Sequence, residues 1–270
     1  GCYHATMYDD EQSPLGIVID RNHLFPSYIA YIGEWGHEAM HILCSESNHR
    51  KMLSNTTDER IKTDETDIMD ILEPCKSEGG DVSLIYRVGN YEYFKYKFRN
   101  VHIRYSYTEQ QEEIASKIVL KYEEMGFCTS YIHGNVGTGK TMFSYLLANS
   151  LKGCICETFN PTEPSDNFDN LYSRVNPTKT KPLIVLLDEI DVLVNNLHHG
   201  AIKPHHKYPV QIYNKTTWNR FFDKINMGLY PNVILILCSN ADPSKIDGLD
   251  KCYLRNERVH IIEKLKQKLI

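Results

Sequence analysis

The pattern of apolar and polar residues divides the chain into an irregular first part and a regular second part. Residues 82–87 and 91–99 have strand-like patterns on either side of Gly89 and Asn90, a pair that favours a hairpin turn. The preceding sequence is rich in Tyr, Ser, His and acidic residues, and its polar stretch at residues 54–67 is typical of a loop. We therefore expect residues 1–107 to form a smaller, β-rich N-terminal domain.

The second part of the chain alternates strand-like and helical patterns. Thr108 and Gln111 form a capping-box pattern, and apolar residues recur at helical spacing from Ile114 until Gly126 ends the helix. From there the order is strand, Gly-rich loop, helix, strand, and then strand, helix, strand. This alternation predicts an α/β fold with a doubly wound, largely parallel sheet over residues 108–270.

A complete phosphate-binding loop follows the first strand of this second part. Strand-like residues 129–133 precede it and helical residues 142–151 follow it, as the motif requires. Backbone N–H groups of such a loop converge on phosphate oxygens, and the helix N-terminus adds partial positive charge. We expect Lys140 to contact the β- and γ-phosphates of ATP and the Thr141 hydroxyl to bind Mg²⁺. The predicted nucleotide-binding residues are Gly134, Asn135, Val136, Gly137, Thr138, Gly139, Lys140, Thr141 and Met142.

An acidic motif supplies the other half of a hydrolytic site. Residues 183–187 form a continuous apolar run, typical of a strand covered on both faces, and Asp188 and Glu189 follow it directly. Ligands of parallel sheets bind at the carboxyl ends of the strands, which is where these acids would lie. We expect Asp188 to hold Mg²⁺, directly or through water, and Glu189 to polarise the attacking water. The sequence therefore predicts a Mg²⁺-dependent ATPase.

A polar residue at the end of the next apolar strand adds a third motif to the phosphate loop and the acidic pair. Residues 233–238 form that strand, and Asn240 follows shortly after it. Together with the phosphate loop and Asp188, this polar residue resembles the AAA+ family of P-loop ATPases, and the resemblance covers residues 108–262. It implies that Asn240 senses the γ-phosphate, and that the protein assembles into a homo-oligomeric ring acting on a protein client.

The resemblance extends, more loosely, to a pair of arginines. Asp250, Arg255 and Arg258 are similar to the region in which AAA arginines reach the ATP of the neighbouring subunit. Such an arginine neutralises charge that develops in the transition state, so hydrolysis would depend on assembly. Asn256 and Glu257 stand where Pro-Gly often separates the two arginines. Few residues follow this region, so we expect a truncated or absent helical lid.

Within the family, the sequence before the core resembles the mitochondrial AAA ATPases that translocate the folded Rieske protein. Residues 80–105 and the loop residues 137–143, Gly-Thr-Gly-Lys-Thr-Met-Phe, carry this resemblance. Those ATPases have an N-terminal transmembrane helix, and no apolar run in this sequence approaches the roughly 20 residues that a membrane helix requires. Membrane function is therefore not carried over to this chain.

Net charge and cysteine content bear on the binding partners and the cellular compartment of the protein. Thirty basic and 35 acidic residues give a formal charge of −5, which provides no global attraction to nucleic acid. The eight cysteines are scattered along a chain too long to need a disulfide framework. We interpret them as reduced thiols and expect a cytoplasmic or nuclear location.

Two weaker features have alternative interpretations. His37, Glu38 and His41 match a zinc-protease pattern if residues 26–42 are helical, but we expect ordinary surface histidines and no zinc. Residues 198–209 carry four histidines and two lysines and predict a loop. In ring ATPases, loops after the second and the acidic strands face the pore, so this loop and Phe168 are candidates for client contact.

Four functions follow from these features. The first is an ATP-driven motor or remodelling chaperone acting on a protein. The second is a nucleic-acid-directed AAA+ ATPase, clamp-loader-like or initiator-like, which the acidic net charge disfavours. A nucleotide-dependent scaffold without turnover is disfavoured by Glu189, and zinc proteolysis coupled to ATP rests only on the histidine pattern.

Overall fold

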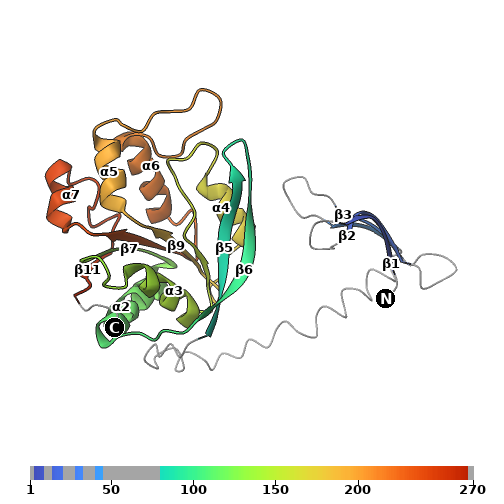
Figure 1. Cartoon of the computed structure of the whole chain (residues 1–270), viewed down its shortest axis with the longest axis horizontal. Helices are drawn as coiled ribbons and strands as arrows, with labels where there is room; N and C mark the ends of the chain where they lie inside the picture. Colours follow the sequence, from blue (N-terminus) through green and yellow to red (C-terminus); the bar gives the residue numbers. More distant parts are fainter. Residues whose placement is uncertain (1–2, 9–13, 21–27, 33–39, 45–79, 267–270) are drawn as a thin grey trace. The chain divides into compact units, whose positions relative to one another are not determined.

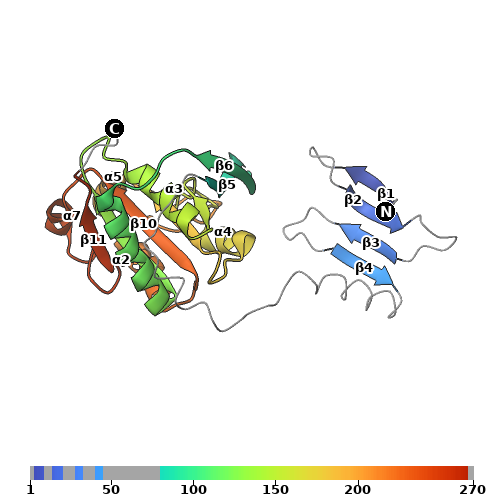
Figure 2. The ribbon, with the colours of Figure 1, turned by 90° about the horizontal axis from the view of Figure 1, so that it is seen from below.

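The chain divides into two compact units, Gly1–Ile71 and Leu72–Ile270. The computed structural model describes residues 3–8, 14–20, 28–32, 40–44 and 80–266. In the first unit, four strands form an antiparallel sheet in sequence order (Figure 2). These strands are β1 (Tyr3–Tyr8), β2 (Pro14–Asp20), β3 (Tyr28–Ile32) and β4 (Met40–Cys44).

The prediction of a helix over residues 26–42 is wrong. β3 and β4 lie in or overlap this range and pair antiparallel, with Ile32 opposite Met40. Their sequences, Tyr-Ile-Ala-Tyr-Ile and Met-His-Ile-Leu-Cys, are rich in residue types that pack well in sheets. His41 therefore lies in a strand, whereas the zinc pattern required helical spacing. His37 and Glu38 lie outside the described residues.

The second unit is built on a seven-stranded sheet (Figure 1). The strand order is β11-β7-β10-β9-β8-β5-β6, and the neighbouring pairs are parallel except for the antiparallel hairpin β5–β6. The strands are β5 (Gly80–Asn90), β6 (Tyr93–Ile103), β7 (Phe127–His133), β8 (Cys154–Cys156), β9 (Leu183–Leu187), β10 (Val233–Ser239) and β11 (Ile261–Lys264).

Helices cover both faces of this sheet, which confirms the predicted α/β class (Figure 1). On one face lie α2 (Glu109–Met125) and α3 (Lys140–Ser150). The other face carries α4 (Phe168–Val175), α5 (Ile190–His198), α6 (Lys215–Asn226) and α7 (Pro243–Leu249). No helix in the described part of the chain is long and apolar enough to span a membrane.

The central strands and the first helix form for reasons visible in the sequence. Every residue of β7, β9 and β10 is buried, as expected for strands covered on both faces. The Thr108 hydroxyl accepts a hydrogen bond from the Gln111 backbone, and the Gln111 side chain accepts one from Thr108, so the predicted capping box is present. Gly126, with φ of 76°, ends α2 in the left-handed conformation.

The β5–β6 hairpin belongs to the large sheet. The sequence placed this hairpin before the predicted boundary at residue 107, whereas β5 pairs in parallel with β8 and the chain divides between Ile71 and Leu72. The reversal occurs at Tyr91 and Glu92, two residues beyond the predicted turn at Gly89 and Asn90. Val82 and Leu84 of β5 are buried with residues of α2 and α3, and this burial fixes the hairpin to the seven-stranded sheet.

The end of the described chain also belongs to the sheet. After β10 come α7 and then β11, which pairs in parallel with β7. No helical bundle lies between β10 and residue 266, the last described residue.

Candidate nucleotide-binding site

The phosphate loop connects β7 to α3 at the carboxyl edge of the sheet. None of its three glycines can be replaced without strain, and Gly137 has a φ of 82°. A Cβ atom on Gly134 would lie 2.3 Å from the carbonyl oxygen of Leu265, and Gly139 caps α3 with a φ of 80°. The backbone therefore curls directly into the N-terminus of α3, which suits anion binding.

Lys140 points into the loop that it follows. Its side chain is nearly buried, and Nζ donates hydrogen bonds to the carbonyl oxygens of Gly134 at 2.8 Å and Asn135 at 3.1 Å. A third bond, 2.8 Å long, reaches Oδ1 of Asn240 at the end of β10. The structure thus brings Lys140 and Asn240 together, although 100 positions separate them in the sequence.

The acidic motif meets the phosphate loop through Thr141. Its Oγ1 donates to Oδ2 of Asp188 at 3.1 Å, and Oδ1 of Asp188 accepts the backbone N–H of Glu189 at 2.9 Å. A hydroxyl and a carboxylate oxygen are hard donors of the kind that Mg²⁺ prefers, and this ion is usually held by few protein groups alongside phosphates and water. The pair therefore fits a Mg²⁺ site next to the phosphate loop.

Glu189 has an unusual backbone conformation for a residue with a side chain. Its φ of 51° and ψ of 39° lie in the left-handed region, where it caps the N-terminus of α5. This conformation costs roughly 1 kcal/mol and is concentrated at functional sites. The exposed carboxylate lies next to Asp188 at the carboxyl end of β9.

A comparison with family models identifies the family to which this fold belongs. Residues 130–266, just over half of the chain, match the model of the ATPase family associated with various cellular activities (AAA). The chain belongs to this AAA ATPase family. Membership implies nucleotide binding and ATP hydrolysis in general, in agreement with the predicted AAA+ core. A search of curated proteins found no significant match.

The two candidate arginines of this AAA domain occupy different environments. Arg258 is 3% exposed, and its guanidinium donates to Asp223, to Asn219 and to the carbonyl oxygen of Cys252. Arg255 has a side chain that is 46% exposed and contacts Asp223 at 3.3 Å. In this conformation the guanidinium of Arg258 is buried and bonded within its own chain, whereas the side chain of Arg255 is still open to solvent.

Asp250, the acidic member of this region, also has partners within the chain. Its carboxylate accepts a hydrogen bond from the backbone N–H of Cys252 at 2.9 Å and forms an ion pair with Lys215. Both interactions favour the ionised form, with the Lys215 contact the larger, and lower the pKa of Asp250 to about 2. Asp250 thus fixes the turn that leads toward Arg255.

Phe168 is a core residue of the AAA domain and has no access to a client. Its side chain is fully buried, with ring centroids 5.4 Å from Phe159, 5.5 Å from Phe221 and 4.9 Å from Tyr230. The prediction of client contact by Phe168 is therefore wrong. Its amphipathic helix α4 turns this aromatic face toward the sheet, where it buries a large apolar area.

The histidine-rich loop after α5 packs against the tip of the β5–β6 hairpin. The His205 ring lies 5.5 Å from that of Tyr91 and stacks at 5.3 Å on Tyr208. The ring nitrogen Nδ1 of His205 accepts the backbone N–H of Tyr208 at 3.0 Å. His206 and Lys207 are exposed beside these rings. The loop and the hairpin tip form one surface, which we name the hairpin–loop surface (Tyr91, His205, His206, Lys207 and Tyr208).

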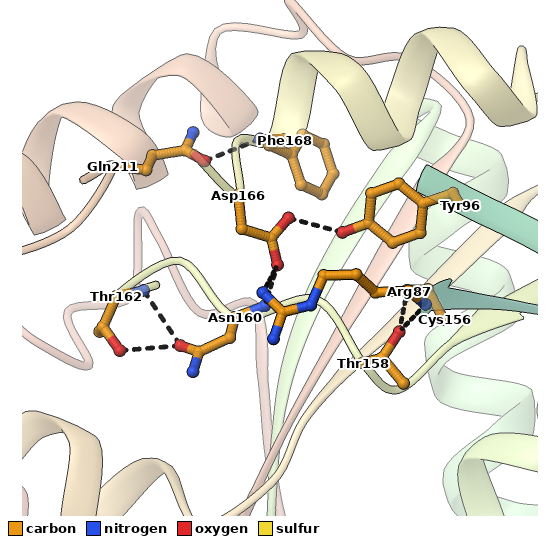
Figure 3. Close-up of polar contacts among 9 residues, drawn as sticks. All are labelled: Arg87, Tyr96, Cys156, Thr158, Asn160, Thr162, Asp166, Phe168 and Gln211. Atoms are coloured by element: carbon orange, nitrogen blue, oxygen red, sulfur yellow. Dashed lines mark hydrogen bonds and ion pairs between the residues drawn. The ribbon is translucent and has the colours of Figure 1, made fainter. Parts of the chain in front are cut away.

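A buried carboxylate that sequence analysis missed connects the hairpin to the loop before α4 (Figure 3). Asp166 is fully buried and accepts hydrogen bonds from the hydroxyl of Tyr96 at 2.6 Å, Nη1 of Arg87 at 3.0 Å and the backbone N–H of Asn160 at 3.0 Å. Burial raises the pKa of Asp166, and the three donors oppose that change. The carboxylate thereby joins both strands of the hairpin to the AAA core.

Asp166→Ala should lower the free energy of unfolding by about 3 kcal/mol, because it leaves a partly buried guanidinium and a buried hydroxyl without their acceptor. Tyr96→Phe removes only one hydrogen bond and should cost about 1 kcal/mol. Urea unfolding followed by tryptophan fluorescence would measure both variants. Equal losses in the two variants would show that the carboxylate has no special structural role.

Proposed function

We propose that this chain is a Mg²⁺-dependent ATPase of the motor type, which assembles into a homo-oligomeric ring and remodels a protein client. The observation that carries the catalytic part is the convergence of two pairs at one edge of the sheet. Lys140 contacts Asn240 at 2.8 Å, and Thr141 contacts Asp188 at 3.1 Å. These contacts unite the phosphate loop with the ends of β9 and β10.

Each residue then has a distinct part in hydrolysis. Lys140 and the loop N–H groups bind the phosphates, and Thr141 and Asp188 would hold Mg²⁺, which supplies positive charge to the phosphate oxygens. Glu189 orients the attacking water and accepts its proton. Asn240, which contacts the Lys140 ammonium, donates its amide N–H toward the γ-phosphate or the water.

The exposure of the proposed catalytic residues supports assembly into an oligomer. Thr141, Asp188, Glu189 and Asn240 are all exposed, and the loop residue Val136 is 77% exposed. An open phosphate site has room for an arginine from a neighbouring subunit, which would neutralise transition-state charge. Arg255 is the accessible candidate, and Arg258 supports it by holding Asp223, with which both arginines interact.

Arg255→Ala should lower kcat by about 10²-fold and leave ATP affinity nearly unchanged, since the side chain meets charge only in the transition state. The wild-type protein should gain specific activity as its concentration rises and subunits assemble. Arg104→Ala, which removes an exposed arginine from the residue after β6, is the matched control.

A mixing experiment shows whether Arg255 acts between subunits. Arg255→Ala subunits retain Glu189, and Glu189→Gln subunits retain Arg255, so a mixed ring contains some complete interfaces. ATPase activity should partly recover when the two inactive variants are combined. Persistent inactivity of co-assembled mixtures, together with a rate per chain that does not change with concentration, would place Arg255 outside the active site.

The protein client is the less direct part of the proposal. Its support is the hairpin–loop surface, in which Tyr91 is exposed at the tip of the hairpin that extends the sheet beyond β8, and His206 and Lys207 are exposed in the loop beside it. Free, buried thiols at Cys128, Cys154, Cys156 and Cys238 suit a reducing compartment, and on this basis we propose a cytoplasmic or nuclear location.

A nucleic-acid-directed ATPase is the second candidate. Between Asp191 and Asp223 the sequence has no acidic residue but four histidines, three lysines and an arginine, and the aromatic rings of the hairpin–loop surface lie in or beside this segment. Cations interleaved with aromatic rings are typical of single-strand binding. ATPase rates measured with single-stranded DNA and with an unfolded protein distinguish the two: stimulation by protein alone supports the first candidate, and stimulation by DNA alone supports the second.

A further inference from the structure

The residues on both sides of Asn240, Ser239 and Ala241, make hydrogen bonds within the chain. The hydroxyl of Ser239 donates to Oδ1 of Asp191 at 2.7 Å and accepts the backbone N–H of Ala241 at 2.8 Å. The carbonyl oxygen of Ala241 accepts the hydroxyl of Tyr131 at 2.8 Å. These hydrogen bonds hold the backbone on both sides of Asn240.

Asn240 is the exposed member of this segment. Ser239 is 1% exposed and Ala241 is 6% exposed, so the residues on both sides of Asn240 are fixed in the core. The buried neighbours fix the backbone at Asn240, and a hydrogen bond of 2.8 Å from Nζ of Lys140 orients its Oδ1. A polar group fixed before the reaction costs no reorganisation in the transition state.

The same hydroxyl joins two catalytic elements that are distant in the sequence. Asp191 lies in the first turn of α5, two residues after Glu189, whereas Ser239 ends β10. The carbonyl oxygen of Ser239 also accepts the backbone N–H of Gly134 at 3.2 Å, at the start of the phosphate loop. Ser239 therefore contacts both the helix that carries the acidic motif and the loop that precedes Lys140.

We propose that Ser239 and Asp191 are positioning residues for hydrolysis, which hold Asn240 against Lys140 and fix β10 relative to the helix after Glu189. This inference rests on the proposed ATPase function. Neither residue of the pair touches ATP or water in this proposal, because the Asp191 carboxylate accepts the Ser239 hydroxyl. Asn240 and Glu189 are the residues that we propose to contact the γ-phosphate and the attacking water. Loss of the Ser239 hydroxyl leaves the phosphate-binding groups in place and frees Asn240 to turn away.

The expected result is a selective loss of turnover. Ser239→Ala should lower kcat about tenfold while the Kd for ATP, measured by calorimetry, changes less than about twofold. Asp191→Ala breaks the same hydrogen bond from the other side and should give a similar loss. Asp191→Asn keeps an acceptor oxygen for the hydroxyl and should retain kcat within about threefold of wild type. Ser239→Thr keeps the hydroxyl and should likewise retain most of the activity.

A double-mutant cycle separates positioning from a general structural effect. If Ser239 acts through Asn240, then adding Ser239→Ala to Asn240→Ala should lower kcat no further. A tenfold loss in both backgrounds would overturn the inference, and so would an Asn240→Ala variant with normal kcat. If Ser239→Ala does not fold, as judged by thermal melting, the cycle is run with Asp191→Ala. Wild-type protein without any ATPase activity would contradict the proposed function itself, whereas additive losses in an active enzyme contradict only the positioning pair.

Discussion

Glu189→Gln should bind ATP normally and lose about 10³-fold in kcat. The substitution keeps the size and shape of the side chain but removes the carboxylate that we propose as the base for the attacking water. Phosphate binding should survive, because the contacts of Lys140 and Thr141 do not include Glu189. Single-turnover phosphate release gives the rate, and calorimetry gives the affinity.

The control for this loss is Glu123→Gln on α2. It removes an equal charge from an exposed position in the last turn of α2, which precedes the start of β7, whereas the phosphate loop follows the end of that strand. Its kcat should match that of the wild type. If Glu189→Gln retains a kcat within about threefold of the wild type, Glu189 is not the base.

Lys140→Ala should weaken ATP binding by about 10²-fold or more, since the phosphate charge loses its nearest cation. The structure adds a second reason, because Nζ of Lys140 also joins the loop carbonyl of Gly134 to Asn240. Fluorescence titration with a labelled ATP analogue measures the affinity. Lys121→Ala, an equivalent loss of charge on α2, should leave the affinity unchanged.

Thermal melting separates the loss of binding from misfolding. The Lys140→Ala variant should unfold at nearly the wild-type temperature without nucleotide and should gain little stability when ATP is added. Wild-type affinity in Lys140→Ala would be incompatible with the phosphate-loop assignment.

Local sequence signals predicted most of the AAA core. The capping box at Thr108, the apolar strands and the Gly-rich loop each depend on residues close together in the chain, and each is present in the structure. The partner of β5 could not be predicted in this way, because the β5–β8 pairing joins Ser83 to Cys154. The sequence pattern therefore assigned the hairpin to the N-terminal domain, whereas its strands belong to the seven-stranded sheet.

The candidate site shows the same division. The residue types in the phosphate loop and acidic motif indicate their chemistry without a structure. The contacts of Ser239 and Asp166 depend on how the strands are ordered, so no spacing in the sequence points to them. Burial also separates Arg258 from Arg255, which look equivalent in the sequence.

Phosphate release from ATP, measured per chain across protein concentration with Mg²⁺ and with a chelator, tests the central claim most directly. The account predicts saturable release that requires Mg²⁺, rises per chain with concentration and disappears in Lys140→Ala. Release that is equal in wild type and Lys140→Ala, or no release at any concentration with Mg²⁺ present, would contradict it.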